Sequence, residues 1–576
     1  PLLSHSSNDH AALIHATGGL PEPAETFTLV AGDFPGIQRA IYTITSKGAA
    51  RGLRGRSAFL QLLGDAIVRR LVHDMGLCWC NVIYEAGGNF LLLAPSAGTD
   101  KVVDWTRQLS SGLLTSFQGD ISFVTACQTV SAYELARKEF KEAYATLKRR
   151  LGAAKQQPFA QIAKTLPDEL FGPRGGVSEK HCAVCHHDPG SKNEKLVRFE
   201  DDWWCVECRR FDTLARDLAE EPRYLSVGDR EPDGASRSSW QGRIYELTGW
   251  WYDFHSQPPT DGRAFFRLND TDFIRSGAAG FRFFATLTPR DEEGHIRDFD
   301  KIARDAVGIE RIGVLRMDVD SLGKLFGEGL HPLTLTRLSA ASSALSLFFD
   351  GWLNVLCREV ETDAGRRNSL YLIYAGGDDL FVVGPWDLMP VLAARVHDDL
   401  AAYVAGNPAI SISAGIETVH RDYPLYRAAE RAREALDEGA KGVWYDRNGQ
   451  PREKNAISFL GQVVGWDDDW QLVCDECNRL LNLDKAGLPK SLIQTVRTVH
   501  AQYEEGRQSL SIPAGQLHYG RWMWMQAYQF TRLAEQHKAY REEIVALQER
   551  LLTPETIHLA GLAARWADYL LRTKTR

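Results

Sequence analysis

Three aspartates in the second half of the sequence have the residue type and spacing for metal-assisted chemistry. Asp318 ends an apolar stretch (RIGVLRMD), and Asp378 and Asp379 follow two glycines in the segment YAGGDDLFVVGP, residues 374–385. Carboxylates that lie close together repel one another, and a divalent cation is the simplest remedy. Oxygen ligands beside a phosphate suit Mg²⁺ or Mn²⁺, and two such ions can activate a hydroxyl and stabilise a leaving pyrophosphate. The pattern therefore predicts a nucleotidyltransferase, provided that the fold brings the three aspartates together.

The residues around these aspartates could bind the phosphates of a nucleotide. Two glycines permit a tight turn and the close approach of a phosphate to the backbone. The segment SLGK follows the first aspartate, and its N–H groups and lysine could hold phosphates. The candidate phosphate-binding residues are Gly376, Gly377, Ser321, Leu322, Gly323 and Lys324. Glycine and aspartate are also common in ordinary hairpin turns, so the turn alone is weak evidence. Asp320 has three open interpretations: substrate binding, a helix cap or a solvent-facing carboxylate.

The sequence around the aspartates occurs twice. The hairpin-like segment 374–385 has a counterpart at 84–95 (YEAGGNFLLLAP), and the strand ending at Asp318 has a counterpart ending at Asp33. Helical and strand-like segments follow in the same order in both halves, which predicts two copies of a βαββαβ unit with a ferredoxin-like fold. In its antiparallel sheet, ordered 4-1-3-2, strand one lies beside strand three. We therefore expect Asp318 to converge with the aspartate turn.

The first copy is expected to be degenerate. It keeps Asp33, but its hairpin reads Gly87-Gly88-Asn89-Phe90. Aligning the two glycine pairs places Asn89 and Phe90 where the second copy has its two aspartates. An amide and an aromatic ring should not hold two metal ions. We expect the first copy to act as a shelf for the acceptor nucleotide and as a structural partner of the second.

Four cysteines form two CxxC pairs separated by nineteen residues. The set is Cys182, Cys185, Cys205 and Cys208. In a chain from a reducing compartment this spacing indicates a closed four-thiolate site with a structural zinc ion. A redox role for one pair is the alternative, and the presence of two pairs argues against it. Three nearby histidines, His181, His186 and His187, could substitute as ligands, and Trp203 and Trp204 are expected to pack over the metal loop.

A third CxxC pair, Cys474 and Cys477, lies on a helical pattern and is interpreted as two ordinary thiols one turn apart.

Taken together, the motifs resemble those of one protein family, the large subunit of type III CRISPR effector complexes, in its Csm-type branch. The motifs other than the cysteine element are GDFPGIQRAIYTITSKGAARGLRGRS (32–57), AGGNFLLLAP (86–95), GIERIGVLRMDVDSLGKLF (308–326), YAGGDDLFVVG (374–384) and KNAISFLG (454–461). The resemblance implies that the second palm domain joins ATP molecules into cyclic oligoadenylates when the complex holds target RNA. It places the metal positions on Asp318, Asp378 and Asp379. It also matches Lys441 to a phosphate-binding lysine, with a solvated surface lysine as the alternative.

The same resemblance implies partners: CRISPR RNA and target RNA through the effector complex, and small helical and RAMP-type backbone subunits. Many relatives begin with an HD nuclease domain of roughly a hundred residues. Here 26 residues precede the first palm strand, and His73-Asp74 and His397-Asp398 are interpreted as surface pairs near helix ends without partner histidines. We therefore expect a chain without the HD domain that does not cleave DNA.

The expected fold class is α+β, with two ferredoxin-like palm domains, a small zinc-binding element and a helical C-terminal domain. The predicted parts are an N-terminal segment (1–26), a degenerate first palm (27–165), a zinc-containing connecting domain (166–305), a catalytic second palm (306–465) and a helical C-terminal domain (466–576). The aromatic-rich helix at 518–536 is expected to form helical core or a subunit interface; a nucleic-acid stacking surface is the alternative.

Composition excludes several classes of protein. The 576 residues are 44% hydrophobic and 25% charged, which is typical of globular domains. The net charge of −8 is unusual for a protein that coats bare nucleic acid by itself. No stretch approaches the ~20 apolar residues of a membrane span, and the first residues do not resemble a secretory signal, so we expect a cytoplasmic protein without a membrane partner.

Two other functions were weighed against the cyclic-oligoadenylate synthase. A stand-alone cyclic dinucleotide synthase would not need the zinc element or the helical C-terminus. A non-catalytic scaffold subunit would not need the intact carboxylates of the second copy. The sequence leaves open the ring size and linkage of the product, and whether S-adenosylmethionine is a co-substrate.

Overall fold

The computed structural model describes residues 27–42, 49–137, 141–163, 167–172, 180–186, 196–199, 202–285, 287–467, 469–513 and 516–572. The chain forms two compact units. Unit 1 consists of Pro1–Thr288, Ser321–Asn354 and Ile373–Asp378, and unit 2 of Pro289–Asp320, Val355–Leu372 and Asp379–Arg576. The predicted N-terminal segment, 1–26, lies outside the described residues.

Unit 1 contains the first palm sheet. Its strands are β1 (Phe27–Asp33), β2 (Val82–Ala86), β3 (Asn89–Pro95) and β4 (Val124–Val130), in the order β2-β3-β1-β4. This is the ferredoxin-like order predicted from the repeat, with strand one between strands three and four. Strand β1 pairs antiparallel with both neighbours, and almost all of its residues are buried.

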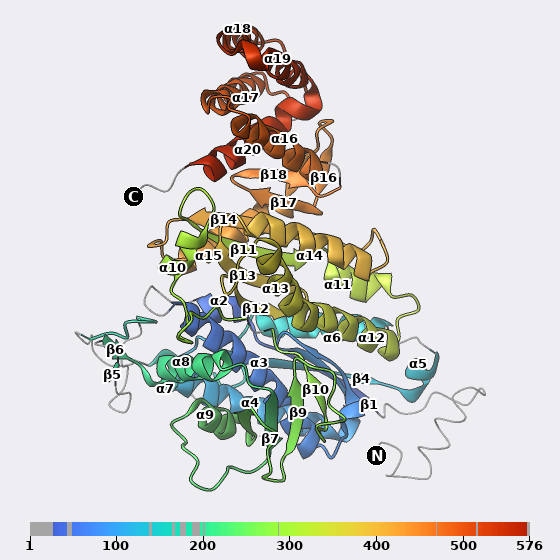
Figure 1. The fold of residues 1–576 in the computed structure, drawn as a ribbon. Helices are drawn as coiled ribbons and strands as arrows, with labels where there is room; N and C mark the ends of the chain where they lie inside the picture. Colours follow the sequence, from blue (N-terminus) through green and yellow to red (C-terminus); the bar gives the residue numbers. More distant parts are fainter. Residues whose placement is uncertain are drawn as a thin grey trace. The chain divides into compact units, whose positions relative to one another are not determined.

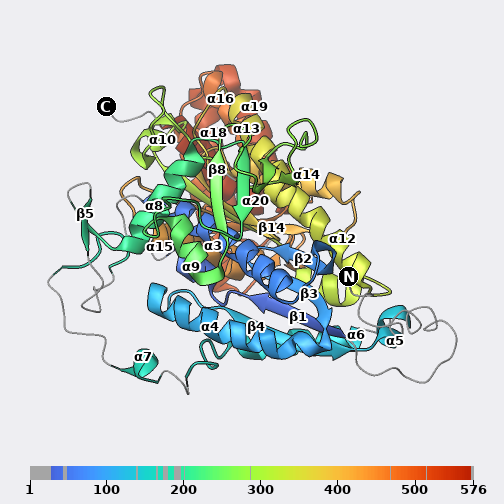
Figure 2. The same ribbon diagram turned by 90° about the horizontal axis from the view of Figure 1, so that it is seen from below.

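Helices cover both faces of the first palm sheet. The long helices α3 (Ala49–Asp74) and α4 (Thr99–Phe117) lie on one side, and α6 (Lys141–Lys155) lies on the other beside α12 (Leu335–Ser346) (Figures 1 and 2). Leu29 of β1, Leu147 of α6 and Leu338 of α12 belong to one buried core. A helix of the second sequence repeat therefore packs on the sheet of the first, which explains why Ser321–Asn354 belongs to unit 1.

A second sheet in unit 1 forms the connecting region. Its strands are β7 (Tyr224–Gly228), β8 (Trp251–His255), β9 (Ala264–Leu268) and β10 (Gly280–Arg282), in the order β10-β9-β7-β8. Helix α8 (Val206–Ala219) precedes this sheet and packs against α3, while α9 (Trp240–Thr248) connects β7 to β8. A Cβ atom on Gly55 of α3 would overlap the carbonyl group of Phe211 in α8, so this crossing requires glycine.

The remaining described elements of unit 1 are short. They are α2 (Ile37–Tyr42), η1 (Trp79–Asn81), η2 (Ser96–Gly98), α5 (Ala132–Arg137), α7 (Pro167–Phe171), β5 (Val197–Phe199), β6 (Asp202–Trp204), α11 (Leu322–Lys324), η3 (Leu325–Gly329) and η4 (Leu347–Trp352).

The second palm sheet repeats the same order and extends it. Strands β12 (Tyr371–Gly376), β13 (Asp379–Pro385), β11 (Ile312–Val319) and β14 (Ile412–Val419) are followed by β17 (Ala456–Phe459) and β18 (Gln462–Gly465). Strand β17 adds in parallel to β14. The helices of unit 2 around this sheet are α10 (Phe299–Asp305), α14 (Met389–Tyr403) and α15 (Leu425–Glu434), and the smaller elements are η5 (Ala435–Ala440), β15 (Val443–Tyr445) and β16 (Pro451–Glu453).

The C-terminal part of unit 2 is helical, as predicted. Helices α16 (Asp469–Lys485), α17 (Ser491–Ser509), α18 (Arg521–Gln536), α19 (Arg541–Arg550) and α20 (Pro554–Leu571), with the short η6 (Lys538–Tyr540), gather beyond β17 and β18 (Figure 1). Helix α20 packs against both α16 and α17. Trp522 of α18 and Tyr503 of α17 are fully buried, whereas Trp524 and Tyr528 of α18 are exposed.

One helical run departs from the expectation that no stretch could cross a membrane. Leu335–Asp363, which comprises α12, η4 and α13 (Leu353–Asp363), is long and apolar enough by length and composition, and 44% of its most apolar window is buried. The core helix of a globular protein passes the same test. Leu338, Phe348 and Phe349 of this run are buried in unit 1, as a core helix requires.

Candidate functional site

The register of the second palm sheet places Asp318 directly opposite Asp379. Strands β11 and β13 pair antiparallel, and these two residues are Cα partners at the end of the ladder. Asp378 comes immediately before, in a tight turn where Gly377 has a φ of 72° and the Asp378 N–H donates to the Gly376 carbonyl at 3.0 Å. The ferredoxin-like order thus produces the predicted convergence of the aspartate turn with the end of the first strand.

Lys441 contacts this site. Its ammonium lies 2.7 Å from the Asp318 carboxylate, and its side chain is only 17% exposed, so it is not a solvated surface lysine. It follows η5, at the end of the last palm helix. Burial raises the pKa of Asp318, an effect that Lys441 opposes. A carboxylate in this setting is stabilised by any additional positive charge.

Asp320 is neither a helix cap nor a solvent-facing carboxylate. It is buried, and its carboxylate accepts hydrogen bonds from the Ser411 and Ser413 hydroxyls at 2.7 and 2.8 Å and from the Asn455 N–H at 3.0 Å. It therefore ties the end of β11 to β14 and to the residue before β17. Its burial and its bonds within the protein make it a structural carboxylate.

The segment that is predicted to bind phosphates, Ser321–Lys324, forms a short turn. Ser321 adopts a left-handed conformation with a φ of 56° ahead of the single-turn helix α11. Gly323 and Lys324 are exposed, and a Cβ atom on Gly323 would meet nothing within 4 Å. The backbone here is thus open on one side, as a phosphate-binding loop requires.

The first palm keeps the aspartate and a lysine but lacks the other carboxylates. Asp33 forms an ion pair with Lys155 and accepts a hydrogen bond from the Asn89 side-chain amide at 3.0 Å. Strand β3 begins at Asn89, as β13 begins at Asp379, and Gly32 pairs with Phe90 as Met317 pairs with Leu380. The glycine-pair alignment used for the sequence is therefore wrong by one residue. Asn89 occupies the position of Asp379, Gly88 that of Asp378, and Phe90 that of Leu380.

Within unit 1, the two glycine turns lie beside each other. Gln61 of α3 donates to the Ala375 carbonyl at 3.1 Å. A Cβ atom on Gly87 would lie 3.5 Å from the Gly376 oxygen. The first copy thus contacts the backbone just ahead of the second copy's aspartates.

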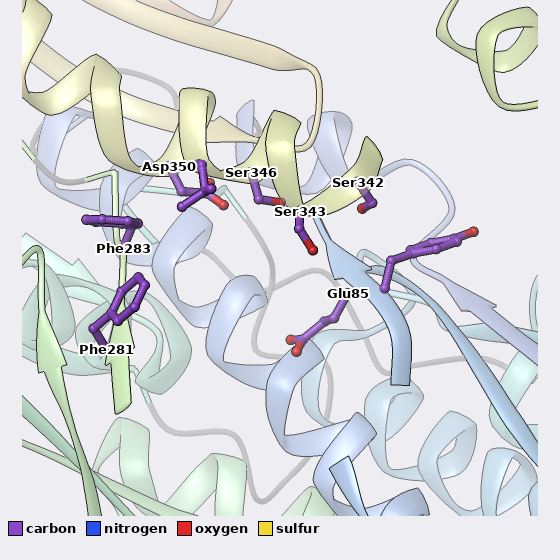
Figure 3. A pocket seen from close by; sticks show the side chains of 9 residues that line it. Glu85, Phe281, Phe283, Ser342, Ser343, Ser346 and Asp350 are labelled. Carbon is purple, nitrogen blue, oxygen red and sulfur yellow. The ribbon is translucent and has the colours of Figure 1, made fainter. Parts of the chain in front are cut away.

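A cavity of about 380 Å³ lies in unit 1 among β2, β10 and the α12–η4 helix. Figure 3 shows Glu85 on one side and Ser343, Ser346 and Asp350 on the other, with Phe281 and Phe283 at one end. The Asp350 carboxylate would lie 3.6 Å from a Cβ atom on Gly376, so the cavity adjoins the glycine turn. Sequence reasoning missed it, because an aspartate and serines on a helix resemble a solvated face.

Both carboxyl groups of this cavity resist ionisation. Burial raises the pKa of Asp350 to about 8, and the nearby charge of Glu85 adds to the effect. Burial likewise raises the pKa of Glu85 to about 7, and the charge of Asp65 adds to it. Asp65 itself keeps a low pKa of about 2 despite its burial, because Arg282 and Arg69 surround it. Below these pKa values the carboxyl groups are protonated and can both donate and accept hydrogen bonds.

The four cysteines of the two CxxC pairs gather as predicted. Their sulfur atoms all lie within 4.8 Å of one another, and Cys182, Cys185 and Cys208 are buried. Cys205 caps the start of α8, and the Arg56 guanidinium of α3 donates to the Cys208 sulfur at 3.6 Å. Four thiols at this separation suit a tetrahedral metal ion.

The aromatic residues beside the cysteines differ from each other. Trp204 is buried, whereas Trp203 is partly exposed, with the Lys180 ammonium over its ring. The backbone carbonyl of Trp203 accepts a hydrogen bond from the Ala183 N–H. His181 and His186 are exposed, and His187 lies outside the described residues.

Ligand atoms from three or more His, Cys, Asp or Glu residues come together at two places in the described part of the chain. One is the cysteine cluster and the other is the exposed trio Asp291, Glu293 and His295. The three palm aspartates do not form such a cluster. The Asp318 carboxylate is instead held by Lys441.

The other sequence candidates take ordinary positions. Cys474 and Cys477 lie on α16, and burial raises the pKa of each thiol to about 12. His73 ends α3 and is exposed, as expected. His397 is not a surface residue: its side chain is 17% exposed and stacks on Trp466 with ring centroids 4.8 Å apart.

Fold and site together define a protein with two palm domains, of which the second carries the paired carboxylates. Comparison with known proteins agrees. Residues 26–171 match the family described as Csm1 subunit domain B, and residues 311–456 match the second palm domain of Cas10/Cmr2.

Curated relatives are Cas10/Csm1 proteins of subtype III-A named single-strand-specific deoxyribonucleases. Those of Methanocaldococcus jannaschii and Thermococcus onnurineus are 27% and 29% identical, over 77% and 75% of this chain and 60% and 57% of their own lengths. The chain thus spans about three fifths of these relatives. A Csm1–Csm4 cassette, solved with cA3 and with one ATP, has a TM-score of 0.70 at 21% identity and covers 97% of this chain and 72% of its own. The chain is thus similar to Cas10/Csm1 proteins of subtype III-A over about three quarters of its length.

Proposed function

We propose that the second palm domain is an ATP-dependent nucleotidyltransferase that makes cyclic oligoadenylates when the assembled type III complex binds target RNA. The observation that carries the proposal is the pairing of Asp318 with Asp379, next to Asp378 and with Lys441 held against the first carboxylate. The structurally similar Csm1–Csm4 cassettes, solved with one ATP and with cA3, support the choice of substrate and product.

The aspartates fit a divalent ion of the Mg²⁺ or Mn²⁺ type. They offer oxygen ligands only, which is the ligand type that these ions prefer. When bound, such ions would supply Lewis-acid activation of the attacking hydroxyl and of the leaving phosphate. Asp318, Asp378 and Asp379 would hold them. Gly376, Gly377, Ser321, Leu322, Gly323, Lys324 and Lys441 would bind the phosphates of ATP.

The cavity beside Gly376 suits the base of the nucleotide. Adenine presents an amino donor next to a ring-nitrogen acceptor, and a neutral carboxyl group presents the complementary acceptor and donor. Guanine presents two neighbouring donors, which an ionised carboxylate would suit better. Because Asp350 stays neutral at physiological pH, we propose that it favours adenine.

The test of the proposed function is to incubate the assembled ribonucleoprotein with ATP and target RNA and to analyse the products by mass spectrometry. We expect cyclic oligoadenylates that depend on target RNA. A chain that cyclises ATP alone, without guide RNA or partner subunits, would instead be a stand-alone cyclase. A complex that binds target RNA without consuming ATP would be a scaffold.

We further propose that the cysteine cluster holds a structural zinc ion. A closed four-thiolate site leaves no position for substrate, and the ion would join the turn that carries Cys182 and Cys185 to the start of α8. Cys182→Ser or Cys205→Ser should lose both metal and stability, because binding and folding are coupled. Elemental analysis of the purified protein that finds no zinc would overturn this assignment.

The proposed partners are CRISPR RNA, target RNA, and small helical and RAMP-type subunits. The fold likeness to a cassette solved with Csm4, and the relatives' subtype, support this choice. The five-part division of the chain made from its sequence also remains a proposal.

A further inference from the structure

Cys78 and Cys80 form a thiol pair at the surface of the first palm domain. Cys78 precedes η1 and Cys80 lies within it, between the end of α3 and the start of β2. Their sulfur atoms are 2.7 Å apart. Cys80 is exposed and Cys78 is partly buried, so both can be reached by a small solute.

A buried amide holds the two thiols together. Asn81 is 2% exposed, and its side-chain oxygen accepts from the Cys78 N–H and thiol, each at 3.3 Å, and from the Cys80 thiol at 4.0 Å. The amide nitrogen donates to the Leu93 carbonyl of β3 at 2.8 Å, which fixes the direction of the oxygen. Both thiols are thus drawn to one acceptor that strand β3 anchors.

We propose that Cys78 and Cys80 are a reversible dithiol–disulfide site that exchanges with small-molecule disulfides. The proposal is independent of the nucleotidyltransferase function. The sulfur separation is already close to a covalent S–S bond of about 2.05 Å, and two residues of one tight turn can close the ring with little movement of the chain.

The exchange proceeds in two balanced steps. The Cys78 thiolate attacks one sulfur of the disulfide RSSR, forming a mixed disulfide and releasing RS⁻. The Cys80 thiol then loses its proton and attacks the Cys78 sulfur, forming the Cys78–Cys80 bond and releasing the second RS⁻, and the two RS⁻ groups take up the two protons. Two protein thiols are oxidised and one small disulfide is reduced. A hydrogen bond with Cys80 lowers the pKa of Cys78 and raises that of Cys80, which suits Cys78 as the attacking sulfur.

Two cysteines of unit 2 provide an internal contrast. Cys474 and Cys477 are buried or partly buried, and burial raises the pKa of each to about 12. They should remain thiols under conditions that oxidise the surface pair.

The experiment uses the purified, zinc-loaded chain in glutathione buffers of increasing oxidised fraction. Remaining thiols are alkylated after denaturation, and the peptides are mapped by mass spectrometry. We expect the peptide with Cys78 and Cys80 to lose two hydrogen atoms and to escape alkylation, while Cys474 and Cys477 are alkylated. In Cys80→Ser the second step is blocked, so Cys78 should accumulate as the mixed disulfide with glutathione. Wild-type protein that accumulates the mixed disulfide without closing the ring, or that oxidises Cys474 and Cys477 as readily, would overturn the proposal.

Discussion

The two palm domains share one polar arrangement and differ at two hairpin positions, where Gly88 and Asn89 of the first palm stand in place of Asp378 and Asp379. In each, an aspartate at the end of the first strand meets a lysine from the end of the last helix: Asp33 with Lys155, and Asp318 with Lys441. Opposite the aspartate, the first palm has the amide of Asn89 and the second has the carboxylate of Asp379.

This difference changes the charge that each cluster must balance. In the first palm the Lys155 ammonium and the Asn89 amide both bind the Asp33 carboxylate, so its charge is balanced within the protein. In the second palm Asp318 is paired with Lys441 and has the carboxylate residue Asp379 as its strand partner, with Asp378 immediately before it. Carboxylates close to one another favour the binding of a cation, which is the role that the proposed function gives them. The comparison teaches that an amide at this position forms a structural hydrogen bond with the aspartate of the first strand without altering the fold.

The largest effect is expected from removing the carboxylates of Asp378 and Asp379. Asp378→Ala/Asp379→Ala should reduce ATP turnover by at least about 10²–10³-fold, because the ligands that stabilise the reacting phosphate are lost. The measurement is product formation by assembled complexes with target RNA present. Thermal unfolding of each variant serves as the control, since a folding defect would imitate a catalytic one. Full activity in the folded double variant would place the chemistry elsewhere in the molecule.

Substituting the lysine of each palm should also give different losses of ATP turnover, but the difference should be smaller than for the aspartates. Lys441→Met should lower turnover by about 10–10²-fold, because a positive charge next to the metal ligands and phosphates disappears. Lys155→Met removes the equivalent charge from the first palm and should leave turnover nearly unchanged while lowering stability. Equal losses of turnover in the two folded variants would mean that the first palm takes part in the chemistry.

A third test concerns the amide itself. Asn89→Ala deletes the hydrogen bond to Asp33, which should cost about 1.5–3 kcal/mol of stability, the range for bonds to charged groups. Its effect on ATP turnover should be much smaller than that of the double aspartate variant, because Asn89 acts through packing or acceptor positioning. If the folded Asn89 variant is as inactive as the double variant, the first palm is a catalytic partner and the idea of a degenerate shelf fails.

The sequence was sufficient for the parts of the site that topology determines. Two repeats with a ferredoxin-like strand order fix which strands are neighbours, so Asp318 had to lie beside the aspartate turn. The alignment of the hairpins was wrong by one residue because it was set by matching the two pairs of identical glycines. In the structure, Gly376 ends β12 and the turn consists of Gly377 and Asp378, whereas Gly87 and Gly88 form the turn of the first palm. The equivalence of the two hairpins is set by the register of β3 on β1 and of β13 on β11. Sequence similarity does not contain this information.

Burial of single charges could not be read from the sequence. Asp320 looked like a cap or a solvent-facing residue, yet two serines and a backbone N–H from distant segments enclose it. The sequence patterns do not single out Asp350 or Glu85, yet residues of both repeats form one cavity around them. Whether a carboxylate is solvated depends on tertiary neighbours, and neither residue type nor periodicity specifies these.

The last test concerns that cavity, where the two repeats meet within unit 1. The pKa of Asp350 is raised from 3.8 to about 8, so the folded protein binds a proton that the unfolded chain releases. Its contribution to stability is therefore complete below pH 4 and is lost as pH rises towards 8. Asp350→Asn cannot ionise and should escape this loss. The variant should unfold at a higher temperature than the wild type at pH 9, by about 2–4 °C for each kcal/mol recovered, with a smaller difference at pH 5.

The matched control for this measurement is Asp104→Asn, which alters an exposed aspartate of α4 paired with Arg107. It should change the unfolding temperature little at either pH, because a surface ion pair contributes at most about 1 kcal/mol.

The same complexes also test the role of the cavity in base recognition. An asparagine amide presents a donor and an acceptor, as the neutral acid does, so Asp350→Asn should retain a preference for ATP over GTP, whereas Asp350→Ala should weaken it. If Asp350→Asn shows the same difference from wild type at pH 5 and pH 9, the carboxyl group is already ionised in the folded protein. The cavity would then be an anionic site, and its match to adenine would no longer hold.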